Sequence, residues 1–185
     1  MSTTQTKVPA GTWNLDPVHS AVGFEVDYLA GTFRGQFRDV QAELGIADSG
    51  ARIEGSAEVA SVDVKDENLA AHLQSPDFFD AERFPQITFR STRIEGNPPK
   101  QEGDRFRLAG DLVIHGSSME VVLDCGYEGR GTDPWGKTRA GFSCRTEIDR
   151  REWGLKWNQA IETGGVLVAN KVRVEGEVQF VRQEE

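Results

Sequence analysis

Apolar and polar residues alternate along most of this chain with a period of two, and this alternation limits its fold more than any other feature. In the run 21–28, for example, Val22, Phe24 and Val26 are apolar and the residues between them are polar or small. The same alternation recurs over residues 105–114, 119–128, 139–148 and 171–180. Such alternation is typical of antiparallel strands with one buried face and one solvated face. The sequence therefore predicts a nearly all-β fold.

A further run, over residues 33–46, changes the phase of its alternation. Its apolar residues are odd-numbered from Phe33 to Phe37, but they are even-numbered from Val40 to Ile46. One extra residue near 38–39 would return the apolar set to a single face, as a β-bulge does. Because bulges bend strands, this run predicts a sheet that curves.

A single short segment has helical periodicity. Leu69 and Leu73 lie four residues apart behind Asp66, which predicts one helix over residues 66–74. No repeat, low-complexity tract or linker divides the chain. We therefore expect one domain over residues 11–182, preceded by a disordered tail over residues 1–10.

The turn at residues 133–136 predicts the pairing of the strands around it. If Pro134 and Trp135 form a two-residue loop, Tyr127 faces Phe142 and the two cysteines face each other. A three-residue loop would need a bulge to keep this register. We expect Cys125 and Cys144 to be buried thiols rather than a disulfide, because cytoplasmic thiols are kept reduced.

The charge balance limits the partners. Lys and Arg number 21 against 30 Asp and Glu, which gives a net charge of −9 and disfavours nucleic acid and anionic membranes. No apolar run approaches the roughly 18 residues of a membrane span. The first seven residues are polar and resemble no signal peptide, so we expect a cytoplasmic protein.

No sequence signature of catalysis stands out. His19, His72 and His115 have no second ligand at metal spacing, and the chain has no nucleophile motif. Gly164–Gly165 lacks phosphate-loop spacing and is interpreted as a turn. We expect no enzyme, no cofactor and no metal, although a three-histidine site assembled in space stays open as an alternative.

About eight or nine strands with one dry face each must form a closed barrel or two packed sheets. Many residues on the dry faces are small, namely Gly35, Ala42, Gly55, Ala57, Gly110 and Ala140. A barrel with such a lining either encloses apolar space or is filled by other segments of the chain.

Several stretches, in order, resemble the YceI-like family of lipocalin-like barrels that bind polyisoprenoid and related long-chain lipids. The resemblance extends from about residue 11 to 181 and is specific as an ordered set. Its stretches are Trp13–Ser20, His72–Asp80, Phe84–Thr92, Gly110–Gly116, Asp133–Gly136, Arg139–Phe142, Gly154–Asn158 and Gly164–Val168.

The resemblance implies a single antiparallel lipocalin-like β-barrel of about eight strands with one or two short helices. It implies non-enzymatic binding, storage or transport of an isoprenoid or another long-chain, fatty-acid-like ligand inside the barrel. A homodimer is compatible with the family. The candidate ligand-binding residues are the dry-face residues Phe24, Val26, Phe37, Phe89, Leu112, Ile114, Leu123, Phe142 and Val168.

Three segments depart from the family pattern, and each departure removes a cation. They are Asp27–Leu29, Leu69–Ala70 and Ser117–Val121. Any contact that the family makes between those cations and a polar lipid head group is therefore not expected in this chain. The chain therefore holds a different head group, a neutral chain or no ligand, and in the last case it is a fully packed structural or protein-interaction barrel.

Overall fold

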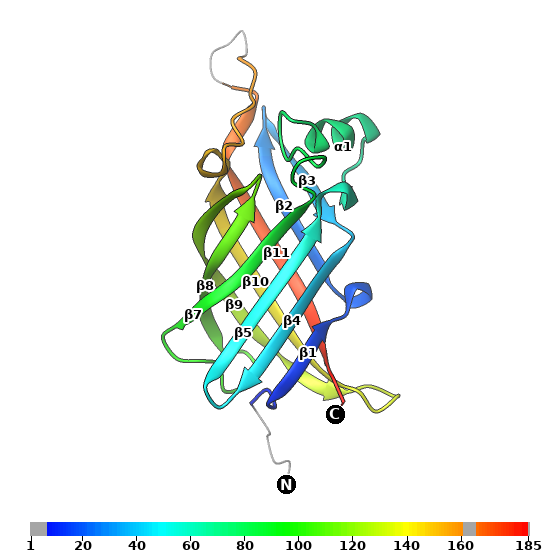
Figure 1. Cartoon of the computed structure of the whole chain (residues 1–185), viewed down its shortest axis with the longest axis vertical. Helices are drawn as coiled ribbons and strands as arrows, with labels where there is room; N and C mark the ends of the chain where they lie inside the picture. Colours follow the sequence, from blue (N-terminus) through cyan, green and yellow to red (C-terminus); the bar gives the residue numbers. More distant parts are fainter. Residues whose placement is uncertain (1–6, 161–165, 185) are drawn as a thin grey trace.

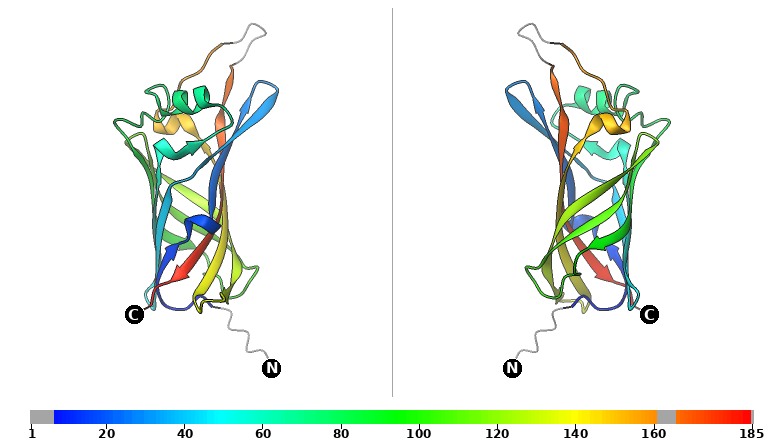
Figure 2. Two further views of the ribbon diagram at one scale, coloured as in Figure 1. Left: turned by 90° about the vertical axis from the view of Figure 1, so that its right-hand side faces the viewer. Right: turned by 90° about the vertical axis from the view of Figure 1, so that its left-hand side faces the viewer.

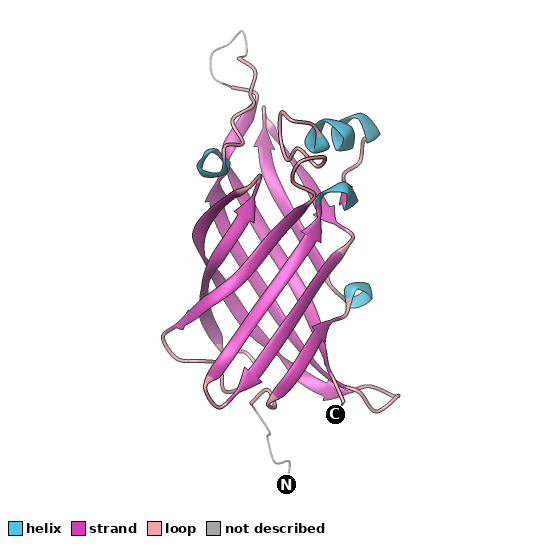
Figure 3. Cartoon of the chain, viewed as in Figure 1, coloured by secondary structure: helices cyan, strands magenta, loops and turns pink. Residues whose placement is uncertain are grey.

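The computed structural model describes residues 7–160 and 166–184. The strands are β1 (Gly11–Leu15), β2 (Ala21–Tyr28), β3 (Gly31–Phe37), β4 (Val40–Ala47), β5 (Gly50–Glu58), β6 (Val62–Asp63), β7 (Gln86–Glu95), β8 (Arg105–Ile114), β9 (Ser117–Thr132), β10 (Thr138–Asp149) and β11 (Val168–Arg182). The helical segments are the α-helix α1 (Glu67–Gln74) and the 3-10 helices η1 (Pro17–His19), η2 (Val59–Ser61) and η3 (Arg150–Trp153). Figure 3 shows how strongly strands predominate. None of the helices in these described ranges has the length and apolarity that crossing a bilayer requires.

The strands close into one antiparallel ring (Figure 1). Around the ring the order is β1, β4, β5, β7, β8, β9, β10 and β11, and β1 completes it by pairing with β11. At this closure Leu15 lies opposite Phe180. The prediction of a lipocalin-like antiparallel barrel of about eight strands is confirmed.

Two strands, β1 and β2, lie beside β11 at different points along its length. β11 pairs with β1 near its end but with β2 over most of its length, and β2 continues into β3 and β6. The expected bulge near residues 38–39 is instead a break between β3 and β4. Ser61 occupies the break, because its backbone oxygen accepts from Arg38 N at 3.1 Å and its Oγ accepts from Asp39 N at 3.0 Å.

The helix predicted over residues 66–74 is confirmed as α1. The Asp66 carboxylate caps its start by accepting from the backbone N of Leu69 at 2.9 Å. Leu73 is 4% exposed and directs the apolar face of α1 into the fold. Figure 2 shows α1 and η3 at one end of the barrel, with the start of β1 and the end of β11 at the other.

The β9–β10 hairpin has the predicted register but not the predicted loop. Asp133 N donates to Lys137 O at 2.9 Å, so the loop contains three residues, 134–136, rather than two. A bulge beside Phe142 compensates, and Tyr127 pairs with Phe142 as expected. Gly136, with φ of 84°, supplies the left-handed conformation that the longer loop requires.

A half-buried carboxylate, that of Asp16, fastens η1 to this hairpin. Asp16 Oδ2 accepts from Arg139 Nη1 and contacts His19 Nδ1, each at 2.7 Å, and Arg139 also donates to Asp133. Burial raises the pKa of Asp16, but the hydrogen bonds from Arg139, His19 and Val18 N outweigh it and lower that pKa to about 2.

Asp16→Asn is expected to lower the free energy of unfolding at pH 7 by about 2 kcal/mol, because a depressed folded-state pKa stabilises the fold above the unfolded-state pKa. The difference in free energy of unfolding between wild type and variant should fall to about half by pH 3. It should vanish as the pH drops through the folded-state pKa of Asp16. Urea unfolding at several pH values measures both effects. Asp48→Asn, at an exposed turn residue, is the control and should change little; a pH-independent loss in Asp16→Asn would contradict the prediction.

Candidate functional site

Charged residues cover the outer face of the barrel. Across β2 and its neighbours, Glu25 pairs with Arg34 at 2.7 Å and with Arg173 at 3.3 Å. On the other side of the ring, Arg90 pairs with Glu54 at 2.9 Å. Because strand residues alternate between faces, the residues between these charges face inward, and the interior is the apolar face.

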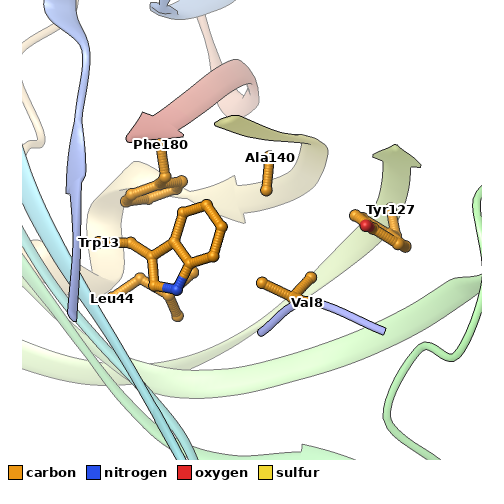
Figure 4. Packing of buried hydrophobic residues seen from close by; sticks show 6 residues of the cluster. All are labelled: Val8, Trp13, Leu44, Tyr127, Ala140 and Phe180. Atoms are coloured by element: carbon orange, nitrogen blue, oxygen red, sulfur yellow. The ribbon is translucent and has the colours of Figure 1, made fainter. Parts of the chain in front are cut away.

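A floor cluster closes the end of the barrel away from α1 (Figure 4). Trp13 is 0% exposed and donates its indole N–H to Pro9 O at 3.1 Å. Val8 packs in the same cluster, although it lies in the stretch 1–10 that the sequence predicts as a disordered tail. Residues 1–6 of that stretch lie outside the described ranges. The members of the floor cluster are Val8, Trp13, Leu44, Tyr127, Ala140 and Phe180.

Two further clusters occupy the interior toward the opposite end. The α1 cluster lies under the helix and consists of Val62, Leu73 and Phe78. The η3 cluster consists of Ile114, Val121, Ile148, Trp153 and Leu155. Trp153 is anchored there by donating its indole N–H to Leu112 O at 2.9 Å. Apolar side chains therefore extend along the interior from end to end.

Seven of the nine predicted lining residues belong to or pack against one of the three clusters. Phe142 packs against the floor cluster, and Phe24 and Phe37 pack against the α1 cluster. Val26 and Val168, each 4% exposed, are buried but belong to none of the three. The remaining four belong to or pack against the η3 cluster, namely Phe89, Leu112, Ile114 and Leu123.

Six of these nine side chains are only half-buried. They are Phe24, Phe37, Phe89, Leu112, Leu123 and Phe142. The floor is different, since Trp13, Tyr127 and Phe180 are at most 1% exposed. These six side chains are therefore packed less completely than the three aromatic residues of the floor.

Small residues on the inner face do not all enclose free space. A Cβ at Gly110 would collide with the ring of Phe89, and one at Gly35 would lie 2.6 Å from the ring of Phe24. Neighbouring aromatic rings thus fill the positions that these glycines leave open. The inference of internal space from small residues is wrong at these two positions.

A groove of about 450 Å³ reaches the α1 cluster from the side. Charged residues of β2, β3 and β11 form its rim, including Glu25 and Arg34. Phe24 and Val64, which pack against the α1 cluster, form part of its lining. The groove lies where β3 pairs with β6 through only two residues, so the wall is thin there.

Sequence reasoning missed Arg150, whose guanidinium is buried near α1. Its side chain donates to Ala169 O at 2.9 Å, Leu155 O at 2.8 Å and Val168 O at 3.4 Å. Burial lowers its pKa from the ordinary arginine value. These bonds fasten the η3 segment to β11 and hold Trp153 over the interior. In the sequence, Arg150 resembles the exposed arginines around it, and no local signal separates it from them.

The three histidines occupy separate elements and have separate contacts. His19 contacts Asp16, and His72 Nε2 lies 3.0 Å from Asp77 Oδ2. The His115 ring packs edge-on against the Phe84 ring, with 4.9 Å between the ring centroids. Within residues 7–160 and 166–184, no group of three or more His, Cys, Asp or Glu side chains is placed to hold a metal ion.

Gly110→Ala is expected to lower the free energy of unfolding by about 1–3 kcal/mol, because the new methyl group would meet the Phe89 ring and the Arg90 carbonyl. Gly131→Ala is the matched control, since nothing lies within 4 Å of a Cβ there. Denaturant unfolding compares the two variants. Equal stability of both would show that the interior yields easily around Phe89.

Comparison with known proteins places this barrel in a family. The profile of the YceI-like domain matches residues 13–180. A UPF0312 protein of Staphylococcus epidermidis is 33% identical over 176 residues, covering 91% of this chain and 96% of the relative. The structure of BcnA from Burkholderia cenocepacia matches with a TM-score of 0.75 at 21% identity, covering 89% of this chain and 98% of BcnA. A polyisoprenoid binding domain from Saccharophagus degradans has the same fold, with a TM-score of 0.64 at 13% identity, covering 92% of this chain and 98% of that domain. The chain belongs to the YceI-like family.

Proposed function

We propose that this protein binds the hydrocarbon chain of an isoprenoid or similar long-chain lipid inside its barrel, and that it stores or transports this ligand. The half-buried apolar side chains beyond the closed floor carry the proposal. Apolar surface left incompletely packed gains free energy when an apolar ligand covers it. An eight-stranded barrel is wide enough to hold one small ligand, as lipocalins do.

Family membership supports this function. The Saccharophagus degradans domain, which shares the fold, is described as polyisoprenoid binding. The nine predicted lining residues are then the contacts for the chain, with Phe142 nearest the floor cluster and Phe24 and Phe37 nearest α1. The ligand would lie along the barrel axis between these two ends.

The α1 end favours a ligand without an anionic head group. The three segments that lack the family's cations lie at the β2–β3 tip, on α1 and after the β8–β9 turn. They contain Tyr28 and Leu29, Leu69, and Met119, respectively. All three segments lie toward the same end of the barrel (Figure 1). A carboxylate or phosphate would not find charge-assisted hydrogen bonds from these three segments. We therefore favour a neutral ligand such as a polyprenol or a quinone with an isoprenoid tail.

The proposal contains no catalytic step. The lining side chains are apolar, and they offer no group that donates or accepts a proton. The two interior thiols are almost wholly protonated at neutral pH, because burial raises the pKa of Cys125 to about 12 and that of Cys144 to about 11. A site of this composition can bind and shield a ligand.

Affinity is expected to rise with the length of the hydrocarbon chain and then to level off. Each buried CH₂ contributes about 0.8 kcal/mol, so an added isoprene unit should tighten binding about tenfold or more after ordering costs. Native mass spectrometry with geranyl, farnesyl and geranylgeranyl alcohols measures this series. Binding independent of length would contradict an interior site.

Leu123→Trp should weaken binding of the longest alcohol at least about tenfold, because the larger side chain occupies volume that the ligand would fill. Asp124→Trp is the matched control, since this neighbouring residue is exposed on the outer face and should leave affinity within about twofold. Thermal unfolding checks that both variants keep the fold. Equal affinity in both would argue against the interior as the site.

One observation favours a second candidate, a fully packed barrel that acts through its surface. The rings of Phe24 and Phe89 already fill the spaces beside Gly35 and Gly110. Solvent extraction and mass spectrometry of freshly purified protein separate the two candidates. A bound isoprenoid or fatty-acyl chain supports the lipid carrier, whereas a protein that stays free of ligand after incubation with polyprenols, quinones and fatty acids supports the packed barrel.

A further inference from the structure

Two cysteines lie side by side on neighbouring strands of the inner wall of the barrel. Cys125 of β9 and Cys144 of β10 are direct cross-strand partners, as the sequence predicted. Both are free thiols, with Cys125 4% exposed and Cys144 half-buried. The proposed lipid-binding function makes no use of either sulfur.

The hydrogen-bond pattern shows which kind of cross-strand pair they form. Tyr127 N donates to Asp104 O at 2.9 Å, so the backbone groups of Tyr127 point toward β8. The backbone N–H and C=O groups of successive strand residues point to opposite sides. Those groups of Cys125, two residues before Tyr127, therefore also point toward β8 and away from β10. The two cysteines are consequently a non-hydrogen-bonded pair of the β9–β10 ladder.

This kind of pair suits a disulfide. Its Cα atoms lie about 4.5 Å apart, which is inside the range of about 4.4–6.8 Å that disulfides span. Cys144 Sγ now lies over Gly176, where a Cβ would be only 2.9 Å away. Cys125 Sγ now donates to Leu123 O at 3.7 Å, so both side chains must turn to form the bond. Rotation about the two Cα–Cβ bonds brings the sulfurs together without a change in strand register.

We propose that Cys125 and Cys144 close to an intramolecular cross-strand disulfide when the protein meets a small uncharged oxidant such as hydrogen peroxide. The Cys144 thiolate attacks one peroxide oxygen, the O–O bond breaks, and a sulfenic acid and one water form. The Cys125 thiolate then attacks the sulfenic sulfur and displaces the second water. Two thiols and one peroxide thus yield one disulfide and two waters, with both electrons passing to oxygen.

Cys144 reacts first because it is the more exposed of the two. Its pKa, raised by burial to about 11, is also below the value of about 12 for Cys125. Thiolate is scarce for both at neutral pH, so the oxidation is slow. The apolar interior admits an uncharged oxidant more readily than a charged one, because a charge would have to lose its hydration. The bridge then ties β9 to β10 beside the ring of Phe142 and limits how far this part of the wall can open.

The test uses the reduced full-length chain under native conditions. After exposure to hydrogen peroxide, the protein is unfolded, treated with a thiol-alkylating reagent and weighed. We expect loss of two hydrogen atoms and of both alkylation sites, a peptide joining Cys125 to Cys144, reversal by dithiothreitol, and a higher Tm in the oxidised state. Two thiols still open to alkylation, separate sulfinic acids or a disulfide-linked dimer would each overturn the proposal.

Cys125→Ser and Cys144→Ser are matched controls. Each removes one sulfur and keeps a side chain of similar size, so each variant should fold but show no rise in Tm after peroxide treatment. A rise in either variant equal to that of the wild type would assign the effect to another oxidised residue and overturn the proposal. Lipid binding takes no part in the test, so its outcome is independent of the proposed function.

Discussion

The pairing of β1 with β11 is the contact on which the rest of this structure depends. It closes the sheet on itself, so every strand of the ring has a neighbour on both sides. Once the ring is closed, the alternation of each strand separates an apolar interior from a charged exterior. Trp13 and Phe180 come from these two strands, so the same closure also builds the floor.

Much of this architecture follows from the sequence, because side-chain alternation is a local property. It predicts the strands, and Asp66 with Leu73 predicts α1. The register of the β9–β10 hairpin could also be predicted, but its loop length could not, because a longer loop with a bulge satisfies the same pattern. The exchange of β1 for β2 along β11 depends on η1 and on long-range pairing, which no local pattern carries.

For the candidate site, the sequence predicts which side chains face the interior but not where along the barrel axis each one lies. Alternation tells which face Phe89 or Leu123 occupies, but not how far along the barrel it lies or which cluster it joins. It also does not reveal that the ring of Phe89 lies over Gly110, because that depends on the rotamer of the ring. The buried position of Arg150 cannot be predicted for another reason, since its hydrogen bonds to backbone carbonyls arise only when η3 folds against β11.

The position of β11 in the ring also determines the order of assembly during synthesis. It is the last strand along the described chain, yet it pairs with β10, β1 and β2. The sheet therefore keeps open edges until β11 has left the ribosome, and its contacts with β1 and β2 close very long loops. Slow, late ring closure follows, with a period in which the apolar inner face and unpaired strand edges are exposed to aggregation.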